Sequence, residues 1–315
     1  MAKLPPITPV VAQKHRNELQ ALFNDLAQKD VYGSDSGFSA DKEAIAKVFK
    51  NTSDYEKNDI LVRLTLIDSM YSTQMNRRYY ALDELAESLA TLAQGKSGIL
   101  KRMFLDFTQR PEECLSLFDY KVGDAQTNLF SECYGIGKGG ESKGVAISLI
   151  SKYAYFETEY GFPIYDSIAC EMYPIVWHYC GLDKKSMPKL TYQGDKGKVL
   201  GDKTMVEYVK AINLIINKLN CKALNYDIFD RYLWFVGKIC RGNLSLVLSR
   251  SEYEDALKIC PPKTIVKTNK KGKQTESVEY FNVKDIDIEK LTFLNSPERK
   301  NIGNFFKLAK FYKTE

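Results

Sequence analysis

Apolar residues recur at helical spacing along most of this chain, and this pattern predicts a mainly α-helical protein. The first helix is expected over residues 11–30, where Leu19, Leu22, Phe23 and Leu26 fall on one face. The same spacing predicts further helices over Asp59–Met75, Arg77–Leu92, 98–107, 111–118, Ala125–Tyr134, Ser142–Phe156, Pro163–Cys180, Thr204–Leu219, Tyr226–Cys240, Ser251–Lys258 and Asn301–Tyr312. The strongly apolar helix over Asp59–Met75 is expected in the interior.

Three segments break the helical pattern. Tyr32–Ser39 has the composition of a loop, and Ser39 is expected to cap the helix that follows. Gly181–Lys203 is glycine-rich, contains six lysines and indicates a long loop or insertion. Pro261–Asp287 alternates β-branched residues on both sides of Asn269–Lys273, which predicts a β-hairpin with a basic tip.

Composition indicates a folded protein of one large or two small domains. The 315 residues are 44% apolar and 12% aromatic, which is enough to fill a sizeable core and excludes disorder over most of the length. A net charge of +5 is compatible with a polyanionic partner and equally with a solvated surface of mixed charge. The N-terminus lacks the apolar core of a signal peptide, and no apolar run reaches the roughly 18 residues of a membrane span.

Cysteine and histidine usage excludes several kinds of site. The seven cysteines are widely spaced and form no C-x-x-C pair, which argues against a disulfide framework and a cysteine zinc site. Free thiols in a reducing cytoplasm explain them simply. Two histidines alone argue strongly against a histidine-built metal site or a histidine-based catalytic triad.

The most informative stretch is Gly135–Asp166. It opens with a glycine-rich turn, continues into a predicted helix with Lys143 near its start, and ends in an apolar-aromatic run that contains Asp166. Glycines let a backbone approach a phosphate, and a helix N-terminus directs free N–H groups towards it. A single carboxylate in apolar surroundings suits the stabilisation of a developing cation or the activation of water.

The order of these parts resembles the helix-hairpin-helix DNA glycosylases, the superfamily of endonuclease III and 8-oxoguanine glycosylase. The most specific match is S-K-x-x-x-F in Ser151–Phe156, followed by F-P-I-x-D-S in Phe162–Ser167. The other matching pieces are Tyr71-Ser72-Thr73-Gln74 at a helix end, the Gly135-Ile136-Gly137 turn, Lys143, and Asp227–Trp234. The chain departs from the family in the inserted Lys138–Ser142, in a longer spacing from Lys143 to Asp166, and in lacking the four-cysteine cluster of endonuclease III.

The resemblance implies a helix-hairpin-helix glycosylase-like helical architecture with a small C-terminal β-hairpin. Residues 1–260 would form a helical domain of two lobes flanking a cleft, with a ribbon and short helix over 261–315 packed on it. Asp166 would stabilise the cationic transition state of base loss, and Lys143 would form a Schiff base, with Lys138 as its substitute if the register is shifted. Asp166 could instead be a pure helix N-cap, and Lys143 a phosphate contact or a solvated side chain.

The resemblance also assigns binding residues. The DNA backbone would be bound by Gly135, Gly137, Lys138, Gly139 and Lys152. The base pocket would be lined by Tyr71, Ser72, Gln74, Tyr155, Tyr165, Tyr232 and Trp234, although core packing explains the residues of Asp227–Trp234 equally well.

These observations predict a DNA glycosylase that flips a modified or damaged base out of double-stranded DNA and hydrolyses its N-glycosidic bond, with AP lyase activity where Lys143 acts. Taken as a whole, the chain resembles anti-phage defence glycosylases that act on glucosylated hydroxymethylcytosine. We expect a cytoplasmic monomer with no cofactor, no metal and no membrane contact. The alternatives are a non-catalytic DNA-binding helical module and a helical protein-interaction domain. The low net charge slightly favours the protein-interaction domain.

Overall fold

The computed structural model describes residues 6–28, 37–51, 55–71, 82–96, 98–112, 120–122, 125–127, 147–188, 190, 202–261, 263–268, 274–279 and 282–314. Within these ranges the protein is mainly α-helical, as the sequence predicts. The helices are α1 (Pro9–Gln28), α2 (Gly37–Asn51), α3 (Lys57–Met70), α4 (Leu82–Ala93), α5 (Ile99–Gln109), α6 (Ile147–Glu157), α7 (Ser167–Tyr179), α8 (Asp202–Leu219), α9 (Tyr226–Cys240), α10 (Arg250–Ile259) and α11 (Lys300–Thr314). None of the described helices is both long and apolar enough to span a bilayer.

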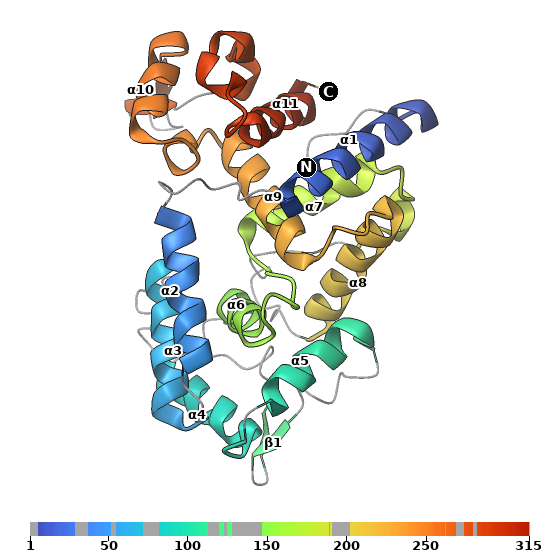
Figure 1. The fold of residues 1–315 in the computed structure, drawn as a ribbon, viewed down its shortest axis with the longest axis vertical. Coiled ribbons are helices and arrows are strands. Elements are labelled where there is room, and N and C mark those ends of the chain that lie inside the picture. Colours follow the sequence, from blue (N-terminus) through green and yellow to red (C-terminus); the bar gives the residue numbers. More distant parts are fainter. Residues whose placement is uncertain are drawn as a thin grey trace.

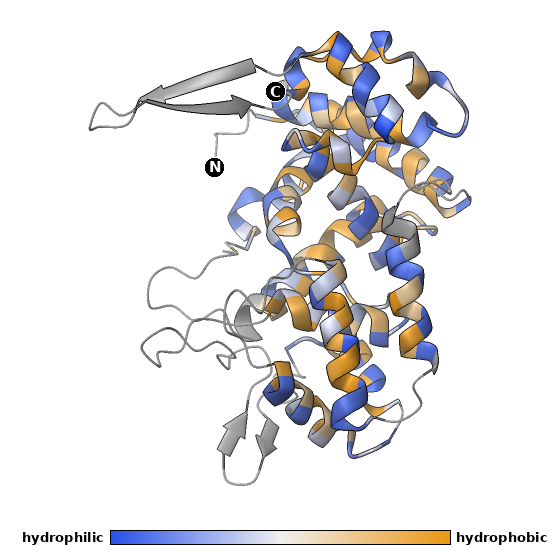
Figure 2. Ribbon diagram, turned by 90° about the vertical axis from the view of Figure 1, so that its left-hand side faces the viewer, coloured by the Kyte–Doolittle hydropathy of each residue, from blue (hydrophilic) through white to orange (hydrophobic). Residues whose placement is uncertain are grey.

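The helices form two packed groups, which meet near α6 in Figure 1. Helices α2 to α6 pack against one another in the lower half of the view. Helix α1 joins the C-terminal half of the chain instead, because it packs against α7, α8, α9 and α11. Figure 2 shows polar and apolar residues alternating along the ribbons, as expected for helices with one buried face. Both groups contribute side chains to a single apolar core.

Local capping explains why the helices around the candidate site begin where they do. Helix α9 has the predicted bounds, and Asn225 caps it by accepting a hydrogen bond from the Ile228 amide at 2.9 Å. Helix α10 begins with a capping box between Ser249 and Glu252. Helix α7 starts at Ser167 rather than at the predicted Pro163, because Asp166 has extended backbone angles and caps the helix.

Two sequence predictions about local structure are wrong. The helix predicted over Ala125–Tyr134 is a strand at Ala125–Thr127 (β2), which pairs antiparallel with Tyr120–Val122 (β1). A Gly-Asp pair lies between these strands in the sequence, and such pairs favour hairpins over helices. Ser39 is not an N-cap, because α2 already begins at Gly37.

Strands β3 (Lys263–Thr268) and β4 (Gln274–Glu279) lie within the range predicted to form a hairpin. They pair antiparallel from Lys263 opposite Glu279 to Thr268 opposite Gln274. The predicted basic tip at 269–273 lies outside the described residues, as do 113–118 of the predicted helix over 111–118. Five cysteines fall in the described ranges, and all five are free thiols: Cys170, Cys180, Cys221, Cys240 and Cys260.

Candidate functional site

Asp166 lies at the head of α7, where its carboxylate is fixed by the helix backbone. Its Oδ1 atom accepts hydrogen bonds from the amides of Ile168 and Ala169, both at 2.9 Å. The predicted cap is therefore confirmed, and the helix dipole adds to the stabilisation of a negative charge at this position. The second oxygen, Oδ2, makes no bond to the cap and faces α6.

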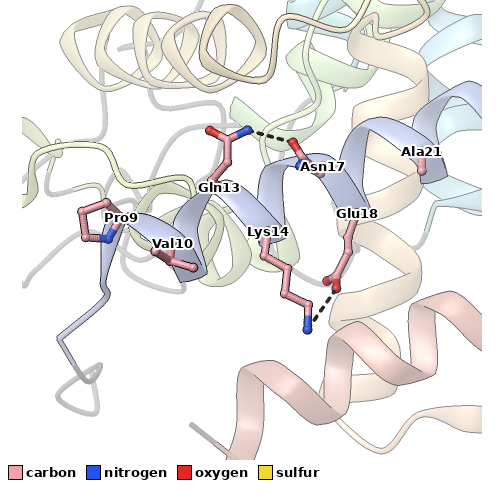
Figure 3. A pocket seen from close by; sticks show the side chains of 7 residues that line it. All are labelled: Pro9, Val10, Gln13, Lys14, Asn17, Glu18 and Ala21. Carbon is pink, nitrogen blue, oxygen red and sulfur yellow. Dashed lines mark hydrogen bonds and ion pairs between the residues drawn. The ribbon is translucent and has the colours of Figure 1, made fainter.

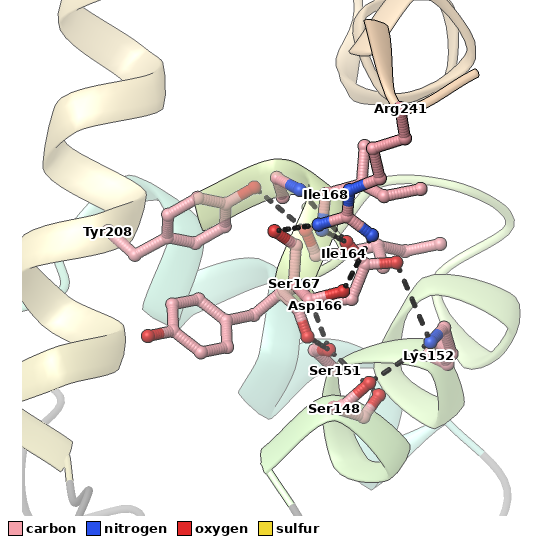
Figure 4. Close-up of polar contacts among 11 residues, drawn as sticks. Ser148, Ser151, Lys152, Ile164, Asp166, Ser167, Ile168, Tyr208 and Arg241 are labelled. Atoms are coloured by element: carbon pink, nitrogen blue, oxygen red, sulfur yellow. Dashed lines mark hydrogen bonds and ion pairs between the residues drawn. The ribbon is translucent and has the colours of Figure 1, made fainter. Parts of the chain in front are cut away.

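Lys152 of α6 points at that second oxygen (Figure 4). Its Nζ atom lies 3.8 Å from Asp166 Oδ2 and donates a hydrogen bond to Ser148 Oγ at 3.0 Å. The Lys152 side chain is only 6% exposed, whereas that of Asp166 is 22% exposed. Lys152 was predicted to contact the DNA backbone, but its ammonium group is directed inward to the carboxylate. The partly open group of the pair is the aspartate.

The segment leading into Asp166 is held by polar contacts from other helices. The backbone amide of Tyr165 donates to Ser151 Oγ at 3.0 Å, and Tyr208 donates to the Ile164 carbonyl at 2.7 Å. On the other side of Asp166, Arg241 donates to both the hydroxyl and the carbonyl of Ser167, at 3.2 and 3.0 Å. These bonds tie the carboxylate rigidly to α6, α8 and α9, as a preorganised charge requires.

One face of α9 carries residues that interact electrostatically with Asp166 and Lys152, and this face is called the stripe of α9 below. Asp230, Trp234 and Lys238 follow at four-residue spacing and are each half-buried, while most residues between them are in the core. Lys238 Nζ lies 5.5 Å from the centre of the Trp234 ring. Burial, and then the charge of Arg241, lower the pKa of Lys238, while Asp166 acts in the opposite direction.

Asp230 is the unusual carboxyl group of the site. Burial, followed by the negative charges of Asp166 and Asp227, raises its pKa from the ordinary 3.8 to about 8. The positive charges of Lys152 and Lys42 lower the pKa of Asp230, but by less than burial and the two aspartates raise it. Asp230 therefore carries a proton at neutral pH, in the same group of charges as Asp166.

Asp227 anchors the start of α9 in a buried network. It accepts hydrogen bonds from Tyr155 of α6 and from Lys42 of α2, the latter at 2.5 Å, and pairs with Arg231 at 2.7 Å. Burial alone would raise the pKa of Asp227, but Lys42 and Arg231 outweigh it and hold the pKa below its ordinary value. Tyr155, predicted to line the base pocket, is thereby committed to this network.

The structure brings some of the predicted pocket residues to the site and not others. Tyr71 lies there, since its ring is 5.5 Å from Lys152 Nζ and the pKa of its hydroxyl is raised by burial and then by Asp230. Trp234 also lies on the facing stripe of α9. Tyr165 packs edge-on against Tyr208 in the core. Tyr232 is fully buried on another face of α9 and is hydrogen-bonded to Tyr312 of α11.

Several predicted site residues lie outside the described residues. These are Ser72 and Gln74 of the base pocket, Gly135, Gly137, Lys138 and Gly139 of the DNA-backbone contact, and the Schiff-base candidate Lys143.

Asp230 lies within the Asp227–Trp234 stretch that matched the glycosylase family, but sequence reasoning assigned no role to it or to Lys238. In the sequence they look like the solvated face of an amphipathic helix, which is the usual place for charged residues. Their four-residue spacing from Trp234 was the available signal, because it places all three on the same face as an aromatic residue already assigned to the pocket.

Surface hollows elsewhere are separate from this site. One of about 730 Å³ lies along α1 (Figure 3), where Gln13 bonds Asn17 at 2.8 Å and Lys14 lies 4.0 Å from Glu18. Another of about 660 Å³ lies between α1 and α11, and one of about 480 Å³ involves α2, α5 and α6. Neither Asp166 nor Lys152 lines any of them. Across the described ranges, no three His, Cys, Asp or Glu side chains are grouped as a metal site would require.

Comparisons with protein-family models, with curated proteins and with solved structures found no match to this chain.

Proposed function

We propose that this protein is a DNA glycosylase, which extrudes a modified or damaged base from duplex DNA and hydrolyses its N-glycosidic bond to leave an abasic site. The observation that supports it best is the geometry of Asp166. One carboxylate oxygen is fixed by two backbone amides, and the other faces Lys152 in a partly open position.

The proposal explains why Lys152 is buried beside Asp166. A purely structural N-cap needs only an oxygen that accepts from the helix amides. It does not need a lysine whose side chain is withdrawn from water and aimed at the remaining oxygen, since burying an ammonium group costs free energy unless it is paired. A pair that fixes the carboxylate is useful where its charge must act on a third group.

That third group is the deoxyribose of the extruded nucleotide. As the bond between C1′ and the base breaks, positive charge develops on the sugar, and a carboxylate held in place stabilises this charge without having to reorganise. Trp234, half-buried on α9, offers a surface on which an extruded base could stack. Lys238, near the same end of α9, supplies positive charge for a neighbouring phosphate, whereas Arg241 is already paired with Glu171 at 2.8 Å.

The decisive experiment compares Asp166→Asn with the wild type. The amide keeps the shape and can still accept from Ile168 and Ala169, so the variant should fold and DNA binding should change by no more than a few-fold, while stability should fall because the buried Lys152 loses its charged partner. Base release should fall by about 10²–10³-fold, as expected for removal of one electrostatic stabiliser. The assay detects abasic sites after incubation with normal, oxidised, alkylated and glucosylated hydroxymethylcytosine duplexes. The last of these tests the anti-phage role.

The outcomes separate the alternatives. Near-normal turnover by Asp166→Asn would remove this residue from the mechanism. A wild-type protein that binds duplex DNA and releases no base would be a DNA-binding module. One that binds no DNA even at low salt would favour a protein-interaction domain.

Lyase activity is tested separately, by borohydride trapping of the enzyme on DNA. Lys143→Ala should lose the covalent adduct and strand cleavage while retaining more of its base release, because the amine acts after or alongside base loss. Trapping that survives Lys143→Ala and disappears in Lys138→Ala would assign the amine to Lys138. If the wild type traps no adduct, the enzyme is monofunctional.

A further inference from the structure

We propose that Asp230 is the proton donor to the departing base, an assignment that rests on the glycosylase function proposed above. It would give the site two carboxyl groups with different tasks. Asp166 stabilises the sugar, and Asp230 protonates the leaving group.

The geometry of α9 places Asp230 in the site. At its start the helix is pinned by Asp227, which bonds Tyr155 and Lys42. At its end it is pinned by Arg241, which bonds Ser167, the residue after Asp166. Asp230 lies one helical turn after Asp227, on the same face of α9 as Trp234 and Lys238. Its side chain is half-buried, so it is not enclosed in the core.

Groups on six elements interact electrostatically with this carboxyl. Its electrostatic neighbours include Asp166 of α7, Asp227 of α9 and, with opposite sign, Lys152 of α6 and Lys42 of α2. Burial, and in addition the charge of Asp230, raises the pKa of three tyrosines: Tyr71 at the end of α3, Tyr155 of α6 and Tyr208 of α8. Burial and the two aspartates dominate, so the pKa of Asp230 stands at about 8 and its proton is retained at neutral pH.

The reaction balances with these groups and water. The bond between C1′ and the base nitrogen breaks, and its electron pair stays with the base. The Asp230 proton is transferred to the base, which leaves neutral, while Asp166 stabilises the positive sugar. Water then adds to C1′, and its released proton restores Asp230. A protonated carboxyl group and a second carboxyl group in one site are suited to this division of acid and stabiliser.

The assignment predicts a substrate class. A neutral base, such as a cytosine derivative, leaves as an anion unless it is protonated, so its release needs an acid. A base that already carries a positive charge, such as 7-methylguanine, leaves neutral without one. Asp230 therefore equips the enzyme for uncharged bases.

The test uses Asp230→Asn on both kinds of leaving group. For an uncharged base that the wild type releases, we expect a loss of about 100-fold or more, in the range of general acid catalysis. For 7-methylguanine in the same duplex, the variant should stay within a few-fold of the wild type. The wild-type rate on the uncharged base should fall above about pH 8, and the variant should lack this alkaline fall. Asp255→Asn, an exposed aspartate of α10, serves as the matched control and should behave like the wild type.

Each outcome decides the assignment. Equal losses on both bases would show a positioning or folding role, and unchanged rates would show none, so either overturns it. Carbon-13 spectra of aspartate-labelled protein give a readout without activity. One carboxyl should titrate near pH 8 in the wild type and be missing in Asp230→Asn, and its absence from the wild type would also overturn the assignment. If the wild type releases no base while that carboxyl titrates near pH 8, the proposed function has failed and the catalytic assignment fails with it.

Discussion

At the scale of single residues, His15 links folding to pH. It lies in α1 with 1% of its surface exposed, and its Nε2 atom is 2.6 Å from the Tyr312 hydroxyl. Its ring packs among those of Tyr179, Phe311 and Tyr312. Burial, followed by the charge of Arg16, lowers the pKa of His15 from 6.5 to about 4. The folded protein therefore holds this imidazole neutral where the unfolded chain would protonate it.

We predict that His15 makes the protein less stable as the pH falls from about 6.5 to about 4. In this window the unfolded state binds the proton and the folded state does not, so the free energy of unfolding decreases by up to about 3 kcal/mol. Above pH 6.5 neither state is protonated and the contribution is complete. Urea denaturation at pH 7.5 and pH 5 should show a smaller difference for His15→Phe than for the wild type.

Asn17, an exposed residue of the same helix with no titratable group, provides the control. Asn17→Ala should keep the wild-type difference between the two pH values. If His15→Phe keeps it as well, the acid sensitivity comes from other groups and the buried imidazole is not its source.

The capping role of Asp166 was predicted from sequence and is confirmed, because an aspartate at a helix start is a typical N-cap. Its catalytic role stays a prediction. Asp230 could not be identified in this way, because its importance depends on which helices α9 packs against. A charged residue on an amphipathic helix acquires an unusual pKa only when tertiary packing buries it beside like charges.

At the scale of elements, the site depends on a close approach of α7 and α9. Gly237 of α9 faces Ile168 and Met172 of α7, and a Cβ atom built on it would overlap Ile168 Cγ2. Ile168 is also one of the residues whose amide holds Asp166. The spacing of these two helices therefore determines where the carboxylate stands relative to the stripe of α9.

We predict that Gly237→Ala destabilises the protein by about 1–3 kcal/mol, the usual cost of overpacking. The direction is opposite to that expected from helix propensity, since alanine is normally favoured over glycine inside a helix by about 1 kcal/mol. Gly303→Ala in α11 is the matched control. Its Cβ would meet Leu294 at ordinary contact distance, 3.5 Å from the carbonyl oxygen, so propensity should prevail and stability should rise.

Urea midpoints for both glycine variants check this directly. A Gly237→Ala variant as stable as Gly303→Ala would show that α7 and α9 can separate without cost. Excision kinetics add a second readout, because widening the helix pair should lower the rate of base release even where the variant remains folded.

Elements were predicted best where local and tertiary signals agree. Helix α9 has an amphipathic pattern and a capping asparagine, and both of its bounds follow from the sequence. Residues 125–127 have no such cap, and their pairing with 120–122 fixes them as a strand. The helical pattern over 125–134 was too short to decide between the two, as is usual for short apolar runs.

At the scale of the whole molecule, buried charges connect the two helix groups. Lys42 of α2 and Asp227 of α9 form an ion pair whose side chains are 9% and 12% exposed. Lys152 of α6 and Asp166 of α7 form another across the same boundary. The sequence indicated a helical protein, but the division into these groups depends on contacts between residues as distant as 42 and 227, which periodicity cannot reveal. The site lies on this boundary, so the pairs that join the groups also align the residues proposed for catalysis.

We predict that Lys42→Met lowers the free energy of unfolding by about 3 kcal/mol, the low end of the range for breaking a buried pair, because Arg231 still neutralises Asp227. The exposed pair of Lys57 and Glu87, 3.2 Å apart, provides the control, and Lys57→Met should cost less than about 1 kcal/mol.

Spectroscopy can follow the two helix groups separately. Both tryptophans, Trp177 and Trp234, lie in the group that contains α7 and α9, so their fluorescence reports on that group, while circular dichroism reports on every helix. In the wild type the two urea transitions should coincide. In Lys42→Met the dichroism should begin to change at lower urea than the fluorescence, because the α2–α6 group has lost a tie to α9. Coincident transitions in Lys42→Met, or an equal cost for Lys57→Met, would show that the two groups are held together by their shared apolar core and that the buried charges serve only to align the site.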